Sequence, residues 1–177
     1  MDHHDHVNLL RGGITATGGL WADLGSGSGA FTLALAEIVG AQAEIYSVDK
    51  DKGALQEQAR AFKTRFPQAH IHYQQADFTT RLPLPLLDGI VMANSLHFHK
   101  QKDAILKLVH GYLKLSGLLL LVEYNVDQGN TWVPYPLTYD SWEALAKKNG
   151  FAKTQFVAAR PSRFLREIYS AVSLKSA

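Results

Sequence analysis

A glycine-rich run, Gly25-Ser26-Gly27-Ser28-Gly29, joins an apolar segment to a stretch with helical periodicity. Glycines are needed where a ligand approaches the backbone and where a turn requires a positive φ angle. Asp49 ends the next apolar segment, where a carboxylate can accept hydrogen bonds from both hydroxyls of a ribose. A glycine turn alone is weak evidence. The turn and the acid together predict a site for a ligand that carries a ribose.

Two histidines, His97 and His99, bring a second kind of chemistry after the fourth apolar segment. An imidazole takes up a proton near neutral pH, so either ring could act as the general base for an oxygen acceptor. The alternative is that one ring is a hydrogen-bonded wall residue and the other faces solvent. The later loop Trp132–Pro136 holds aromatic rings and prolines, which would form either a hydrophobic substrate wall or an ordinary packing contact. Tyr135 in this loop is a further, weaker catalytic candidate.

The elements that must position these residues alternate between short apolar runs and helical patterns, which is typical of a parallel sheet covered by helices. We expect a Rossmann-like α/β fold, with a seven-stranded, mostly parallel sheet, helices on both faces and a C-terminal antiparallel hairpin. The predicted strands are Leu20–Leu24, Ile45–Asp49, His70–Gln75, Gly89–Ala93, Leu118–Tyr124, Phe151–Ala158 and Phe164–Val172. The predicted helices are Phe31–Val39, Lys52–Phe66, Asp103–Leu113 and one capped by Asp140 that runs to Asn149, and Gly117 is expected to mark a turn.

The start of the chain is polar and glycine-rich, and we expect it to fray before a short helix around His6–Arg11. The run Met1–His6 contains residue types that bind metals, but a flexible terminus lacks the fixed geometry of a metal site, so no metal is predicted. We assign residues 1–177 to one domain. Residues 1–19 are an extension that is a candidate cover for the cofactor.

The composition of the chain limits the kinds of molecule that we expect it to bind. The chain has 177 residues, is 46% hydrophobic and carries a net charge of +2, with acids and bases interleaved. It therefore has neither a basic stripe for nucleic acid nor one for an anionic membrane. There is no cysteine, which excludes disulfides and thiolate metal sites, and no apolar run of about 20 residues. We expect a cytoplasmic protein that acts on a small molecule.

At its motifs, the sequence resembles class I S-adenosylmethionine-dependent methyltransferases of the small-molecule type, over roughly residues 18–172. The segment Trp21–Gly29 is similar to the family's first motif, with Asp23 two positions before the first glycine. The other similar segments are Ser47-Val48-Asp49 for the second motif, Gln75-Ala76-Asp77-Phe78 for the adenine-binding acidic element and Asp88–Asn94 for the fourth motif. The resemblance implies S-adenosylmethionine as cofactor, with S-adenosylhomocysteine as product.

The same resemblance implies which residues contact the cofactor. The glycine run lies against its methionine and ribose, Asp49 takes the ribose hydroxyls, and Asp23 acts near the methionine amino group, directly or through water. Lys50, Asp77 and Phe78 flank the adenine. The implied set is Asp23, Gly25, Ser26, Gly27, Gly29, Asp49, Lys50, Asp77, Phe78, Asn94, Ser95 and Leu96, of which the last three close the methionine end.

The acceptor must reach the methyl group from the carboxyl edge of the sheet. Candidates there are the histidines, the segment Glu123–Tyr139, and Arg160 and Arg163 near the hairpin tip, which would either receive an anionic acceptor or be merely solvated. Little of the chain is left to cover a large substrate, so we expect a small acceptor, or closure by a second copy in a homodimer.

Two alternatives stay open. The first is a non-catalytic module that binds the same adenosyl cofactor and regulates a partner. The second is an NAD-dependent oxidoreductase, because Gly25, Gly27 and Ala30 also fit the dinucleotide-binding pattern. An oxidoreductase of this class normally needs a second catalytic region, for which the sequence offers no candidate.

Overall fold

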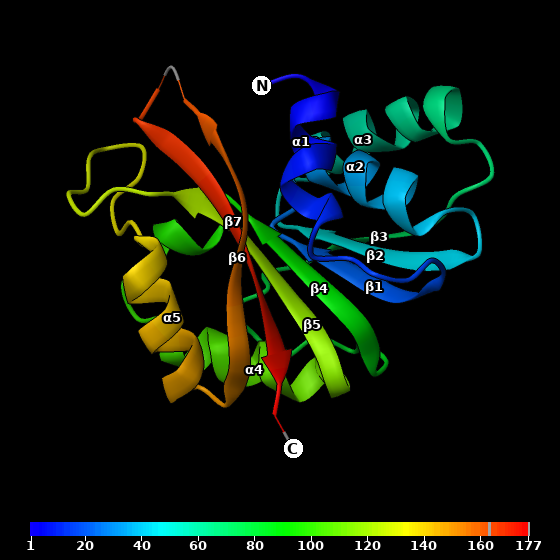
Figure 1. Ribbon diagram of the computed structural model, residues 1–177. Coiled ribbons are helices and arrows are strands. Elements are labelled where there is room, and N and C mark those ends of the chain that lie inside the picture. The colour runs from blue at the N-terminus through cyan, green and yellow to red at the C-terminus, as the bar shows by residue number, and fades with distance from the viewer. Residues whose placement is uncertain (163, 177) are drawn as a thin grey trace.

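A seven-stranded sheet runs through the computed structural model, which describes residues 1–162 and 164–176 (Figure 1). Its order is β3-β2-β1-β4-β5-β7-β6, and β7 runs antiparallel to both of its neighbours. The strands are β1 (Gly19–Leu24), β2 (Ala43–Asp49), β3 (His70–Gln75), β4 (Leu87–Ala93), β5 (Leu113–Tyr124), β6 (Phe151–Pro161) and β7 (Glu167–Lys175). The helices are α1 (His3–Arg11), α2 (Ala30–Val39), α3 (Lys52–Arg65), α4 (Asp103–Tyr112) and α5 (Tyr139–Lys148), with a 3₁₀ turn η1 (Leu96–Phe98). The predicted fold class is confirmed.

Two hydrophobic cores lie on the two faces of the sheet. Helices α1, α2 and α3 cover one face, and α4 and α5 cover the other (Figure 1). Alternate residues of β5 serve the two cores: Leu119 and Leu121 pack toward α4 and α5, and Leu120 and Val122 pack toward α1 and α2. Burial on both faces explains why this strand is continuously apolar.

Several predicted boundaries are wrong. Asp140 does not cap α5: Oγ1 of Thr138 accepts from the backbone N–H of Ser141 (3.2 Å), so the helix begins at Tyr139. The predicted turn at Gly117 lies inside β5, because Leu113 and then Leu118 pair with β4 and the residues between them bulge out. The hairpin also differs from the prediction, since β6 extends to Pro161 and β7 begins at Glu167.

The expected frayed start is also wrong. Oδ1 of Asp2 accepts from the backbone N–H of Asp5 (2.9 Å), and the Asp5 carboxylate accepts from that of Asp2 (3.3 Å). This capping box fixes the first turn of α1, and the helix then buries Val7, Leu9 and Leu10. Helix α1 therefore packs on α2 and reaches β6. Within the described part of the chain, no helix has the length and apolar character to span a membrane.

Candidate cofactor and acceptor site

A cleft of about 400 Å³ opens at the carboxyl ends of β1, β2 and β4. The position follows from the strand order, since connections leave β1 and β4 in opposite directions and a crevice forms between them. The lining residues are Gly25, Gly27, Asp49, Lys50, Ala76, Asp77, Phe78, Asn94, Ser95, Phe98 and His99. Most of the residues implied at the cofactor therefore meet in one cleft.

The glycine turn is shaped by close packing on one side and by open space on the other. Gly25 has φ +79°, and a Cβ there would lie 2.5 Å from Cβ of Ser95. Gly27 has φ +53°, and nothing lies within 4 Å of where its Cβ would be. Larger side chains are thus excluded at Gly25 by the protein, while the open space at Gly27 lets a ligand approach the backbone.

Asp49 holds this turn in place. Its Oδ2 accepts from the backbone N–H of Gly27 (2.7 Å), and its Oδ1 accepts from that of Asp51 (2.8 Å). Each carboxylate oxygen keeps capacity for a further donor. The half-buried carboxylate therefore suits a pair of ribose hydroxyls.

Asp23 lies beneath the turn and is 1% exposed. Its Oδ2 accepts from the hydroxyl of Thr32 (2.6 Å), and its Oδ1 has no hydrogen-bond partner among the described residues. Burial raises the pKa of this carboxyl to about 7, and the charge of Asp49 adds to the rise. Oδ1 of Asn94, on the neighbouring strand end, is likewise buried without a described partner, and its backbone has φ +51°. Two unpaired acceptors here fit the ammonium group of a bound amino-acid moiety.

The remaining implied residues lie behind the cleft lining. The Ser26 hydroxyl is 2.8 Å from that of Ser47, which donates to Oε1 of Gln58 (2.6 Å). Nε2 of Gln58 in turn donates to Thr32 (2.8 Å), the partner of Asp23. These side chains form a buried polar network that supports the glycine turn.

Gln58 was not foreseen as part of the site. It stands three residues after Leu55 and four before Phe62, on the apolar face of α3, and it is 0% exposed. A lone amide in such a stripe is the signal that identifies it. It also fills the space beside Gly29, where any Cβ would overlap its side chain.

The turn η1 carries the predicted base, His97, which pairs with a carboxylate from β5. Glu123 is 0% exposed, and its Oε1 accepts from the backbone N–H groups of Leu96 and His97 (both 3.1 Å). Its Oε2 lies 2.5 Å from Nδ1 of His97. The side chain of Leu96 is fully buried in the core, so only its backbone serves the site.

This pairing assigns the imidazole tautomer. Glu123 accepts from two backbone N–H groups, so its contact with the imidazole leaves the proton on Nδ1. In the neutral ring, Nε2 then presents a lone pair. Nε2 makes no hydrogen bond to any residue that the structure describes. A histidine oriented in this way by a buried acid can act as a general base. Glu123 was expected only to line the pocket. An acid directly after the apolar run Leu118–Val122 is the sequence signal for its role.

His99 and Tyr135, the other catalytic candidates, lie in different surroundings. His99 lines the cleft with its ring edge-on to Phe78 (5.3 Å between centroids), and burial lowers its pKa. Tyr135 does not line the cleft. Its backbone N–H donates to the carbonyl of His97 (3.0 Å), and its carbonyl accepts from Nζ of Lys102 (3.0 Å). Nζ of Lys102 also donates to the carbonyl of His99 (2.7 Å), so this buried lysine ties the loop to η1.

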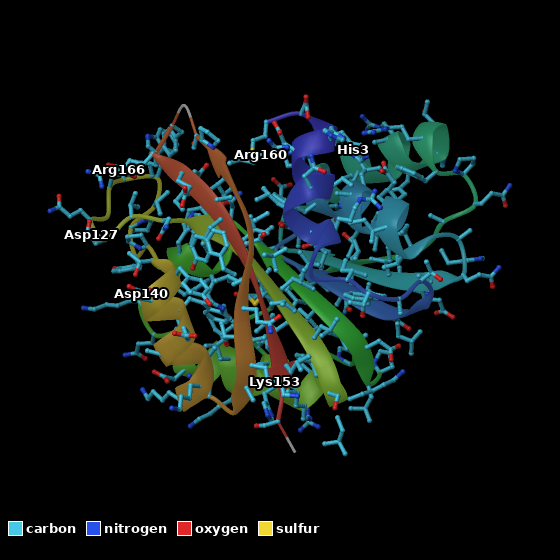
Figure 2. The ribbon with its side chains drawn as sticks, viewed as in Figure 1. His3, Asp127, Asp140, Lys153, Arg160 and Arg166 are labelled. Carbon is cyan, nitrogen blue, oxygen red and sulfur yellow. The ribbon has the colours of Figure 1, made fainter. Side chains whose placement is uncertain are left out.

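Arg160, one of the charged candidates near the hairpin, does not line the cleft. Arg160 lies beside α1 in Figure 2, with its Nε 3.3 Å from Oδ1 of Asp5. Arg163 lies outside the described residues. Nε2 of His3 is 2.8 Å from Oε2 of Glu37 on α2. No cluster of three or more His, Asp or Glu suited to a metal occurs in residues 1–162 and 164–176.

The sheet order, the glycine turn after β1 and the acid at the end of β2 define a nucleotide-binding fold of the methyltransferase type. A family described as a methyltransferase domain matches residues 22–117, which is more than half of the chain. The chain belongs to this family, and so to the class I S-adenosylmethionine-dependent methyltransferases.

Solved structures share the fold at low sequence identity. The YcgJ protein of Bacillus subtilis is 15% identical with a TM-score of 0.79, and the match covers 99% of this chain and 100% of that one. A SAM-dependent methyltransferase of Aquifex aeolicus is 14% identical with a TM-score of 0.76, covering 97% and 89%. Human N-acetylserotonin methyltransferase, solved in complex with SAM, is 21% identical with a TM-score of 0.68, covering 89% and 48%. A sequence comparison with curated proteins gives no match.

Proposed function

We propose that the protein transfers a methyl group from S-adenosylmethionine to a hydroxyl group of a small molecule, with His97 as general base. The observation that carries this proposal is the buried pair of His97 and Glu123. His97 does not itself line the cleft, but it lies in the chain between the lining residues Ser95 and Phe98. An amine or a stabilised carbanion needs little help from a base, whereas a hydroxyl needs its proton removed. A base held in one tautomer therefore favours oxygen as the acceptor atom.

The cleft residues fit the cofactor part by part. Asp49 and the open backbone at Gly27 suit the ribose, and Asp77 and Phe78 suit the adenine. The unpaired oxygens of Asp23 and Asn94 suit the methionine ammonium. When bound, the cofactor supplies a methyl group that its sulfonium has already activated.

The protein's own contribution is to orient the acceptor and to take up its proton. The acceptor hydroxyl gives its proton to Nε2 of His97, and its oxygen forms the new bond to the methyl carbon. The carbon–sulfur bond breaks at the same time, and its electron pair stays on sulfur. Glu123 stabilises the imidazolium that results, and burial of both side chains (3% and 0% exposed) keeps water from competing.

Calorimetric titration with S-adenosylmethionine, S-adenosylhomocysteine and NAD tests the cofactor part. We expect micromolar binding of the two adenosyl ligands, loss of at least about tenfold in affinity in Asp49→Ala, and no change in Asp127→Ala, a control on the exposed loop labelled in Figure 2. Binding of NAD alone would refute the proposal.

Release of S-adenosylhomocysteine in the presence of hydroxylated compounds tests the catalytic part. We expect His97→Gln to abolish most of this release and to leave cofactor affinity unchanged. Tight cofactor binding with no release for any acceptor would favour the non-catalytic module.

A further inference from the structure

A second cavity, of about 470 Å³, opens at the same edge of the sheet. It is built by the start of α1, the end of β5 and described residues at the adjoining ends of β6 and β7. The lining residues are Met1, Asp2, Asp5, Tyr124, Pro161, Ser162, Phe164 and Ile168.

His97 lines neither cavity, but its ring lies near a lining residue of each. Its ring centroid is 4.3 Å from that of Phe98, which lines the cofactor cleft. The same centroid is 6.3 Å from that of Tyr124, which lines the second cavity. A continuous series of rings thus links the two cavities, with the proposed base in the middle.

Two of the eight lining residues of the second cavity, Tyr124 and Phe164, are aromatic. Tyr124 and Phe164 meet edge to face, with 5.8 Å between centroids, and Ile168 lies beside them in the lining. Phe164 is 52% exposed, which leaves much of an aromatic ring available to a ligand. Burial raises the pKa of the Tyr124 hydroxyl, and the charge of Glu123 adds to the rise, so this hydroxyl stays protonated at neutral pH and does not compete with His97 as a base.

The two acidic residues that line the cavity, Asp2 and Asp5, do not require a cationic ligand. The carboxylates of Asp2 and Asp5 accept from each other's backbone N–H groups, and Asp5 also pairs with Arg160. Each carboxylate therefore already has partners within the protein. The apolar rings are what a ligand would cover.

We infer that this second cavity binds the methyl acceptor and that the acceptor is a phenol with one or two aromatic rings. The inference rests on the proposed function. The acceptor ring packs against Tyr124 and Phe164, and its hydroxyl points toward Nε2 of His97. The cavity volume lies within the range of sites for ligands of this size.

Fluorescence titration with 2-naphthol, in the presence of saturating S-adenosylhomocysteine, tests the inference. Catechol and cyclohexanol compete in the same assay as a second phenol and as a non-aromatic alcohol. We expect both phenols to bind and cyclohexanol to fail as a competitor. Phe164→Ala should weaken 2-naphthol binding about tenfold.

The matched control is Phe156→Ala. Phe156 is a similarly exposed ring of the same hairpin (46%), and it packs against Tyr139 and Tyr169 rather than lining the cavity. It should leave 2-naphthol binding unchanged. Because Phe164 is half exposed, its removal leaves the core intact, and thermal unfolding of both variants verifies this.

The inference is overturned if neither phenol binds, if cyclohexanol competes as well as catechol, or if both variants lose the same affinity. Methylation of 2-naphthol, detected by mass, is a separate readout for the proposed function. Binding that depends on Phe164 without methylation would support the cavity assignment while counting against His97 as the base. Failure of the adenosyl ligands to bind would refute the proposed function independently.

Discussion

Asp23→Asn is predicted to make the ligand-free protein more stable at neutral and alkaline pH. The Asp23 carboxyl is fully buried, and its pKa rises from 3.8 to about 7 on folding. A carboxyl with a raised folded-state pKa binds its proton more tightly in the folded state. Its contribution to stability is therefore fully present below pH 3.8 and is lost as the pH rises to about 7. This difference in pKa corresponds to roughly 4 kcal/mol of unfolding free energy, a large part of the total for a domain of this size.

Urea unfolding of the cofactor-free protein between pH 4 and pH 8 measures this effect. Asparagine is neutral throughout, so the variant should gain about 4 kcal/mol relative to the wild type as the pH rises over this range. Comparing the two proteins cancels the shared groups whose pKa is lowered, such as Asp77 and Asp88, which give the opposite slope. Asp127→Asn, on an exposed loop, serves as the control. Parallel stability curves for the wild type and Asp23→Asn would refute the reasoning.

Three further substitutions test the site. His97→Gln should lower kcat for a phenol by about 10²- to 10⁴-fold. The difference in kcat from the wild type should shrink at high pH, where the phenol ionises without a base. A difference that does not change with pH would argue against His97 as the general base. Glu123→Gln should lower kcat less and shift the pH profile, and an unchanged profile in steady-state kinetics would contradict its orienting role. Gly25→Ala should lower S-adenosylmethionine affinity by at least tenfold and the free energy of unfolding by about 1 to 2 kcal/mol. The new methyl group would clash with Ser95, and residue 25 has a positive φ that alanine rarely adopts. Calorimetry measures the affinity, and urea unfolding measures the stability.

The sequence predicts the parts of the site that depend on neighbouring residues. The apolar runs give the strands, and the run Gly25–Gly29 with Asp49 gives the ligand turn, because strand, turn and helix are encoded side by side. The contacts of Gln58 and Glu123 depend on which distant segments become adjacent, and periodicity carries no such information. The start of the chain differs from the prediction for another reason. Its polar composition indicates fraying, whereas the capping box of Asp2 and Asp5, which is also present in the sequence, fixes the first turn of the helix.

The irregular turn after β4 shows how the two halves of the site depend on each other. The η1 turn contributes His97 to the proposed chemistry, and the same stretch contributes Asn94 and Phe98 to the cofactor cleft. One carboxylate, Glu123, accepts two backbone N–H groups and the imidazole of this turn, so it fixes the cleft wall and the base together. A buried acid without these partners would be strongly destabilising, which gives the turn a single stable arrangement. The shape of the proposed cofactor cleft and the orientation of the proposed base are therefore coupled through the end of β5, the strand whose last residue, Tyr124, also lines the second cavity.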